Sequence, residues 1–270
     1  MSSPRSKARD TLQTIEGGLF DYPKYYDVVF GTTSNAEFKF LLGCLDRHAG
    51  RAVRRVFEPA CGSGRLLIKF AERGYDVCGC DLNRHAVDYC NARLRRKGLP
   101  ASVVVSDIEH FRLPVPADAA FNMISSFQHL LTESSAESHL RSMEASIAGG
   151  GIYVVGVQLM PSRGGRTQME RWSGRRGQLF VASRMWTKRI LARRREEVCG
   201  LTSDVITPRA RARIREELTL RTYTARQMDA LLRRVPGFAC VATYDFTYDL
   251  ASPIVVGPDT QDVVYVLRKA

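Results

Sequence analysis

The sequence lacks any apolar run that approaches the roughly 18 residues of a membrane span. It has no apolar segment behind its first basic residues, so we expect no signal peptide. The seven cysteines include no Cys-x-x-Cys pair, which argues against a metal site and in favour of reduced, buried thiols. A chain of 270 residues with 44% hydrophobic content can bury a full core. Together these features predict a cytoplasmic protein with no membrane partner.

A strand, a turn of small residues and the start of a helix follow one another between Val56 and Arg65. A second apolar strand ends at Asp81, about 20 residues further on, as a nucleotide-binding βαβ unit requires. A dinucleotide fingerprint needs a third glycine where this chain has Leu67, so a pyrophosphate site is poorly supported. Glu58, just before the turn, would repel phosphate but suits a ligand with an ammonium group. The pattern predicts an adenosine-containing cofactor; a turn without any ligand is the alternative.

These residues resemble motif I of the class I S-adenosylmethionine-dependent methyltransferases, Glu-x-Gly-x-Gly-x-Gly, with Ala60 in place of the first glycine. The substitution matters only if the turn requires a positive φ at Ala60. The resemblance implies S-adenosyl-L-methionine as cofactor, with Asp81 on the ribose hydroxyls and Asp107 on the adenine amino group. The cofactor-binding residues that it implies are Tyr26, Glu58, Ala60, Gly62, Gly64, Asp81, Leu82, Asp107, Ile108 and Ser125.

The rest of the chain continues as in that family. Asn83 is predicted to cap a helix over residues 84–97, and residues 103–105 are predicted to form a buried strand. Further strands are predicted at residues 121–124, 152–157, 238–248 and 263–267, and a helix is predicted at residues 134–147. The fold class is therefore α/β, a doubly wound seven-stranded Rossmann-like sheet with an antiparallel β insertion after the fifth strand.

Four segments are expected from this pattern. They are an N-terminal helical and aromatic lid (1–50), the cofactor-binding core (51–157), a basic antiparallel insertion (158–222), and a C-terminal helix and hairpin (223–270).

The insertion carries most of the net charge of +12, because it holds 16 lysines or arginines and only 6 aspartates or glutamates. Residues 209–215 alternate arginine with small or apolar residues, which predicts a strand with one basic face. This face could bind nucleic acid, hold an anionic small substrate, or be a solvated surface or homodimer contact. We expect the insertion to form part of the substrate cavity or a dimer contact.

Methyl transfer from a sulfonium mainly requires an aligned nucleophile and the exclusion of water, so no catalytic motif has to appear. His129 follows a core strand on the side where the methyl group is expected, and it is the candidate general base. His110 is a weaker candidate, and a packing role is the alternative for His129. Tyr26 belongs to an aromatic N-terminal run and is the candidate contact to the sulfonium, with ordinary packing as its alternative.

The sequence also separates classes of methyltransferase. Enzymes that methylate exocyclic amino groups of bases resemble one another in an Asn/Asp-Pro-Pro-aromatic loop, but this chain has Ser-Ser-Phe-Gln at residues 125–128, and no cysteine precedes a proline. We therefore predict a methyltransferase with a small-molecule acceptor, similar to those acting on amino-sugar and glycine-type amines, with nucleic acid less favoured as a partner. The alternatives are an RNA or protein methyltransferase that docks through the insertion, and a non-catalytic cofactor-binding or scaffold protein. The acceptor atom stays open, since nitrogen, oxygen, sulfur and carbon acceptors share this core.

Overall fold

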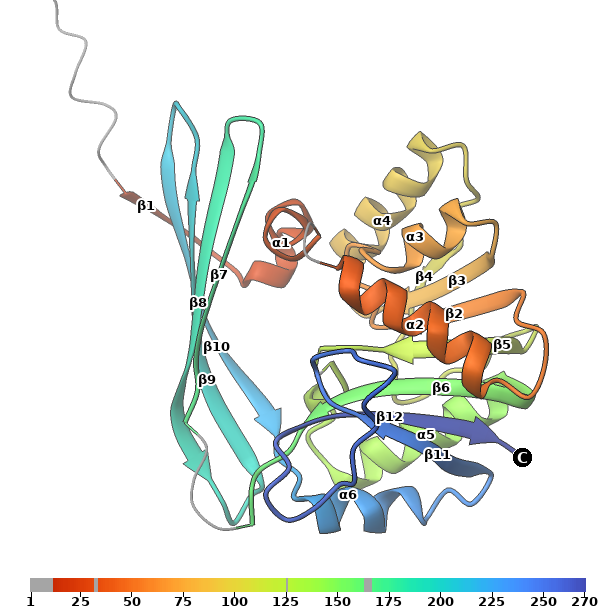
Figure 1. Ribbon diagram of the computed structural model, residues 1–270. Helices are drawn as coiled ribbons and strands as arrows, with labels where there is room; N and C mark the ends of the chain where they lie inside the picture. The colour runs from red at the N-terminus through yellow and green to blue at the C-terminus, as the bar shows by residue number, and fades with distance from the viewer. Residues whose placement is uncertain (1–11, 32–33, 125, 163–166) are drawn as a thin grey trace, which may run out of the picture.

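The computed structural model describes residues 12–31, 34–124, 126–162 and 167–270, which form two β-sheets and the helices around them (Figure 1). The larger, seven-stranded core sheet has β12 antiparallel to both neighbours, while its other neighbouring strands run parallel. In order across the sheet, the strands are β11 (Phe238–Tyr244), β12 (Asp262–Lys269), β6 (Ile147–Gln158), β5 (Ala117–Asn122), β2 (Arg55–Pro59), β3 (Asp76–Asp81) and β4 (Val103–Val105). This order confirms the predicted doubly wound α/β fold.

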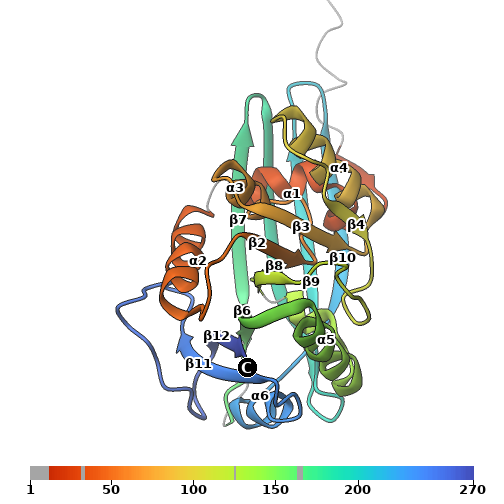
Figure 2. The ribbon, with the colours of Figure 1, turned by 90° about the vertical axis from the view of Figure 1, so that its right-hand side faces the viewer.

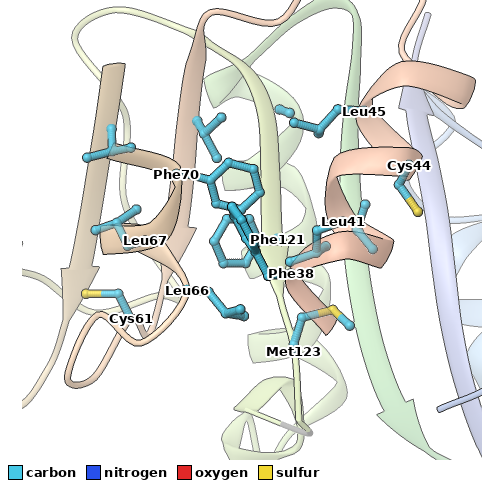
Figure 3. Packing of buried hydrophobic residues seen from close by; sticks show 14 of the residues in the cluster. Phe38, Leu41, Cys44, Leu45, Cys61, Leu66, Leu67, Phe70, Phe121 and Met123 are labelled. Carbon is cyan, nitrogen blue, oxygen red and sulfur yellow. The ribbon is translucent and has the colours of Figure 1, made fainter. Parts of the chain in front are cut away.

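Helices cover both faces of the core sheet, and Figure 2 shows α2 and α5 on opposite sides of it. One face packs against α2 (Asn35–His48), α3 (Leu67–Glu72) and α4 (Arg84–Arg96), and the other against α5 (Glu133–Ser146) and α6 (Ala225–Leu232). On the first face the Phe70 and Phe121 rings stack with their centroids 5.1 Å apart, beside Phe38 (Figure 3). This packing fixes α3, and therefore the turn that leads into it, on the sheet. No described helix is long and apolar enough to cross a membrane.

The predicted helix cap at Asn83 is confirmed, and a further cap is found at Thr224. The Asn83 side chain accepts hydrogen bonds from the backbone N–H groups of His85 and Ala86 at the start of α4, and Thr224 caps α6 through the N–H of Gln227. The prediction of a buried strand at residues 103–105 was wrong for two of its residues. Val103 is buried, but Val104 and Val105 are exposed because β4 is the edge of the sheet.

The second sheet, called the accessory sheet from here on, confirms the predicted antiparallel insertion after the fifth core strand, β6. In order its strands are β1 (Leu12–Ile15), β10 (Arg211–Arg221), β9 (Glu196–Ile206), β8 (Leu179–Leu191) and β7 (Met169–Arg176). The N-terminal β1 joins it by pairing parallel to β10, which the sequence did not predict.

The helix α1 (Pro23–Phe30) and the short 3-10 helix η1 (Leu19–Asp21) lie between the two sheets (Figure 1). Val28 and Val29 of α1 pack with Val181 and Leu201 of the accessory sheet. A Cβ on Gly174 would lie 1.8 Å from the carbonyl oxygen of Val28, so only glycine permits this close approach. The helices of the N-terminal segment (1–50) therefore pack on different sheets: α2 packs on the core sheet, and α1 packs on the accessory sheet.

Candidate active site

A cavity of about 490 Å³ opens at the carboxyl ends of the core strands, where ligands bind in open α/β sheets. Its walls come from η1 and α1, from the turn after β2, from the loops after β3 and β4, and from η2 (Ser126–His129) with the start of α5. The described residues that line it are Phe20, Pro23, Tyr26, Ala60, Gly62, Ser63, Asp81, Leu82, Asn83, Ala86, Asp107, Ile108, Glu109, Ser126, His129, Leu130, Leu131, Thr132 and Ser135.

Asp81 connects the end of β3 to the turn after β2. Its Oδ2 accepts a hydrogen bond of 2.8 Å from the N–H of Gly62, and its Oδ1 accepts one of 2.9 Å from the N–H of Asn83. Burial raises the pKa of Asp81, which these two backbone hydrogen bonds partly offset. A carboxylate has about four acceptor positions, so Asp81 can still accept hydrogen bonds from a ligand in the cavity.

Ala60 adopts a positive φ of 52°, as do Gly62 (53°) and Gly64 (71°). The substitution of the first motif glycine therefore does matter, because an L-residue with a Cβ is strained in this region. Gly64 does not line the cavity. A Cβ there would lie 2.3 Å from the Sγ of Cys90, so this glycine lets the turn pack closely on α4.

Glu58 lies beneath the turn and is not among the residues that line the cavity. Its Oε2 accepts a hydrogen bond of 3.1 Å from the N–H of Leu67 at the start of α3. Burial raises the pKa of Glu58 well above its ordinary value, which Arg65 opposes. Arg65 is itself buried and paired with both carboxylate oxygens of Glu37. In this structure Glu58 supports the turn from below.

Aromatic rings form the N-terminal wall. The Tyr26 ring lies 5.7 Å from that of Phe20, and Phe20 meets the His129 ring edge to face at 5.9 Å. Burial raises the pKa of the Tyr26 hydroxyl, and Arg65 lowers it in part. Phe20 was not among the predicted site residues, although its place in the aromatic run before α1 was the available signal.

The loop after β4 brings Asp107 and Ile108 to the cavity, and α5 holds it there. The Ile108 carbonyl oxygen accepts a hydrogen bond of 2.7 Å from Nδ1 of the buried His139, and the Ser142 hydroxyl donates to the Glu109 carbonyl oxygen at 3.1 Å. Nearby, Leu82 is 70% exposed, so a large apolar side chain faces the space that a ligand would fill.

His129 ends η2 and is exposed at the cavity wall. Desolvation by the surrounding protein lowers its pKa, and the charge of Asp81 opposes this. The preceding Gln128 is buried and fixes η2, since its amide donates to the Arg221 carbonyl oxygen at 2.9 Å and accepts from the N–H of Gln158 at 3.2 Å. His110 does not line the cavity and bonds to Ser138 instead. Ser125, predicted to bind cofactor, lies outside the described residues.

The charges of the cavity differ from those of the whole chain. The described lining residues include the acids Asp81, Asp107 and Glu109 but no lysine or arginine, and none of them comes from residues 158–222. Some arginines of the insertion form ion pairs with acids outside it, such as Arg176 with Asp27 of α1 and Arg195 with Glu133 of α5. The described cavity is acidic although the protein is basic.

The strand order, the glycine-containing turn after β2 and the acid at the end of β3 together define the Rossmann-like fold of the class I S-adenosylmethionine-dependent methyltransferases, as predicted. Residues 56–151 match the family model described as "Methyltransferase domain".

Curated relatives match a part of the chain. A ubiquinone biosynthesis O-methyltransferase of Chromobacterium violaceum is 27% identical over 110 residues, which are 41% of this chain and 47% of that protein. The one of Nitrosospira multiformis is 35% identical over 82 residues, which are 28% of this chain and 34% of that protein. The matches therefore span less than half the length of these relatives.

Solved structures match nearly the whole chain in fold. DesVI of Streptomyces venezuelae has a TM-score of 0.74 at 18% identity, with 95% of this chain and all of that chain covered. The amino pentose methyltransferase CalS10 of Micromonospora echinaspora has a TM-score of 0.69 at 19% identity (96% and 100% covered). The sugar N-methyltransferase KedS8 of Streptoalloteichus sp. has one of 0.67 at 18% identity (100% and 99% covered). At these identities the likeness concerns the fold.

Proposed function

We propose that the chain binds S-adenosyl-L-methionine in this cavity and catalyses transfer of its methyl group to a small-molecule acceptor. The observation that carries the proposal is the hydrogen bond between Asp81 and Gly62, because it sets an acid with free acceptor positions beside the turn that the cofactor must approach. Asp81 would bind the ribose hydroxyls and Asp107 the adenine amino group. Leu82 and Ile108 would pack against the adenine ring.

The remaining predicted contacts divide into direct and indirect roles. Ala60 and Gly62 would allow close approach of the backbone, and Tyr26 with Phe20 would exclude water from the sulfonium. Glu58 and Gly64 would act indirectly, since they hold the turn and do not line the cavity. We also propose that Ser125 contacts the cofactor.

When bound, the cofactor supplies a methyl group that is already activated by the sulfonium. The protein then has to align the acceptor and accept a proton from it. His129 is suited to the second task, because a lowered pKa keeps its imidazole neutral near pH 7 and able to take a proton. Phe20 packs against its ring, and Gln128 fixes the short helix that carries it.

The acceptor that fits this cavity is a neutral or cationic small molecule, and we propose an amine. Three carboxylates and no lysine or arginine among the described lining residues would repel an anionic acceptor, which the net charge of the insertion had suggested. The names of the whole-chain structural neighbours support nitrogen as the acceptor atom, since KedS8 is a sugar N-methyltransferase and CalS10 an amino pentose methyltransferase. The curated relatives are O-methyltransferases but match less than half of their own length.

Calorimetric titration with S-adenosylmethionine and S-adenosylhomocysteine, with NAD as a control, tests the proposal. We expect micromolar binding of the first two alone, or about −8 kcal/mol. Asp81→Asn should weaken this binding about tenfold or more, because it removes charge-assisted hydrogen bonds. Asp76→Asn at the exposed start of β3 removes the same charge and is the matched control. Absence of binding, or equal effects of the two variants, would overturn the assignment of the site.

A further inference from the structure

The strand predicted at residues 209–215 begins at Arg211 in the structure, as β10. Its arginines at residues 211–215 take no part in the cavity and lie on the opposite side of the accessory sheet from α1. Ile214 is buried in the cluster that packs against α1, so the alternation of a strand directs Arg211, Arg213 and Arg215 to the other face. Figure 1 shows that face with no helix or strand of the described chain over it. We call it the outer face. The residues that define it are Arg171, Arg175, Phe180, Ala182, Arg184, Trp186, Thr202, Asp204, Arg213, Arg215 and Glu217.

Strand pairing arranges arginines in a line across this face. Arg171 lies opposite Arg184 on the next strand, Arg184 opposite Thr202, and Thr202 opposite Arg215. Neighbouring strands are about 4.8 Å apart, so the line carries positive charge across four strands. Arg171, Arg184 and Arg215 form no ion pair with any described carboxylate, whereas Arg213 pairs with Asp204.

On the outer face, the guanidinium groups of two arginines stack on aromatic rings. Arg184 lies 4.9 Å from the centre of the Trp186 ring, and Arg175 lies 5.2 Å from that of Phe180. A Cβ on Gly200 would lie 2.5 Å from the Trp186 ring, so the glycine allows the indole to lie directly on the strand. Stacking restricts the guanidinium groups before any partner arrives, which lowers the entropic cost of binding.

The outer face is also grooved. Two hollows of about 430 and 460 Å³ lie on it, and both are lined by Arg184, Thr202 and Arg213. One also includes Trp186 and the other Phe180. The first hollow also includes Glu216 and Glu217 and the second Asp204, but basic residues outnumber the acids in both. The shared arginines therefore line one shallow path of net positive charge between the two rings.

We propose that the outer face binds single-stranded nucleic acid. Phosphates would lie along the line of unpaired arginines, and bases would stack on the guanidinium and aromatic planes, as in other sequence-independent single-strand sites. A second copy of this chain is a poor occupant, since a two-fold contact would bring like charges together. An acidic protein matches the charge but does not use the stacked planes. The site is separate from the cavity and does not depend on the proposed function.

Fluorescence anisotropy with labelled (dT)20 and (rU)20 tests the proposal on the full chain. We expect dissociation constants of about 1 to 100 µM at physiological salt, with affinity that falls as salt increases. R184Q/R215Q should weaken binding at least tenfold and reduce the slope of log affinity against log salt by about 1.4. R95Q/R96Q on the exposed end of α4 changes the net charge equally and should have little effect. Trp186→Leu should weaken binding without changing the salt slope.

Three outcomes would overturn the proposal. One is the absence of binding at low salt, and another is an equal loss in R184Q/R215Q and R95Q/R96Q. The third is equal affinity for a 20-residue oligoglutamate, which would indicate an acidic protein partner. Thermal melting of each variant shows that it is folded. S-Adenosylmethionine binding should be unchanged in all of them, so failure here leaves the proposed function intact.

Discussion

Asp27 of α1 and Arg93 of α4 form an ion pair of 2.8 Å between Oδ1 and Nη1, and the same Nη1 donates to the Ser63 carbonyl oxygen at 2.7 Å. The other oxygen of Asp27 pairs with Arg176 of the accessory sheet at 2.7 Å. Asp27 is fully buried. One carboxylate thus joins the helix that carries Tyr26 to the turn of the proposed cofactor site and to the accessory sheet.

Replacement of Asp27 by asparagine should therefore affect stability and ligand binding together. The change leaves two arginines without their partner, and we expect the free energy of unfolding to fall by about 3 kcal/mol. S-Adenosylmethionine affinity should fall several-fold because the turn and α1 lose their shared anchor. Urea unfolding and calorimetry measure the two effects. Asp88→Asn, which breaks an exposed pair with Arg84 on the same α4, is the control and should cost less than about 0.5 kcal/mol. Equal effects would remove the anchoring role of Asp27.

Replacement of Ala60 should raise the stability of the protein, in contrast to replacement of Asp27. Its φ of 52° is strained for alanine, so Ala60→Gly should raise the free energy of unfolding by about 1 kcal/mol. The control is Ala230→Gly at an exposed position of α6, which should lower the free energy by about 1 kcal/mol because glycine disfavours a helix. Denaturant unfolding of both variants compares them directly. A loss of stability in Ala60→Gly would mean that the turn tolerates the alanine without strain.

The proposed base gives a pH prediction. Desolvation lowers the pKa of His129, so its neutral form increases as pH rises through a value below 6.5, and kcat/KM should rise over the same range. His129→Ala should lower kcat by about 10² to 10⁴ and remove this rise, with little change in cofactor affinity. His110→Ala, at the other candidate, should leave both unchanged, since it is exposed outside the cavity. A pH profile that survives in His129→Ala would assign the residue to packing.

The sequence predicted features that depend on neighbouring residues along the chain. The turn from Ala60 to Gly64, the cap at Asn83, the acid that ends β3 and the acid that follows β4 can be predicted from local spacing. They meet because parallel strands end at one edge of the sheet.

Other features depend on contacts distant in sequence. Glu58 lies under the turn because the N–H of Leu67 binds it there, and the charge of the insertion faces away because Ile214 packs against α1. The sign of the charge in the cavity could not be read from the net charge of the chain. The exposure of Val104 depends on β4 being the edge strand, which the residues themselves do not reveal.

His139 links stability to pH beneath the proposed adenine site. It is fully buried, its Nε2 lies 2.9 Å from the Tyr153 hydroxyl, and burial lowers its pKa to about 4. An unfolded histidine has a pKa of about 6.5, so the unfolded state binds more protons between these values. The free energy of unfolding should therefore be largest above pH 6.5 and fall as pH decreases towards 4, by about 3 kcal/mol at most.

Urea unfolding at a series of pH values measures this dependence. His139→Gln should be less stable at pH 7, because it weakens the support of the Ile108 loop, and its stability should fall less between pH 6.5 and 4. His85→Gln, at an exposed position of α4, should follow the pH dependence of the unmodified protein and is the matched control. If His139→Gln kept the full dependence, other groups would be responsible for it.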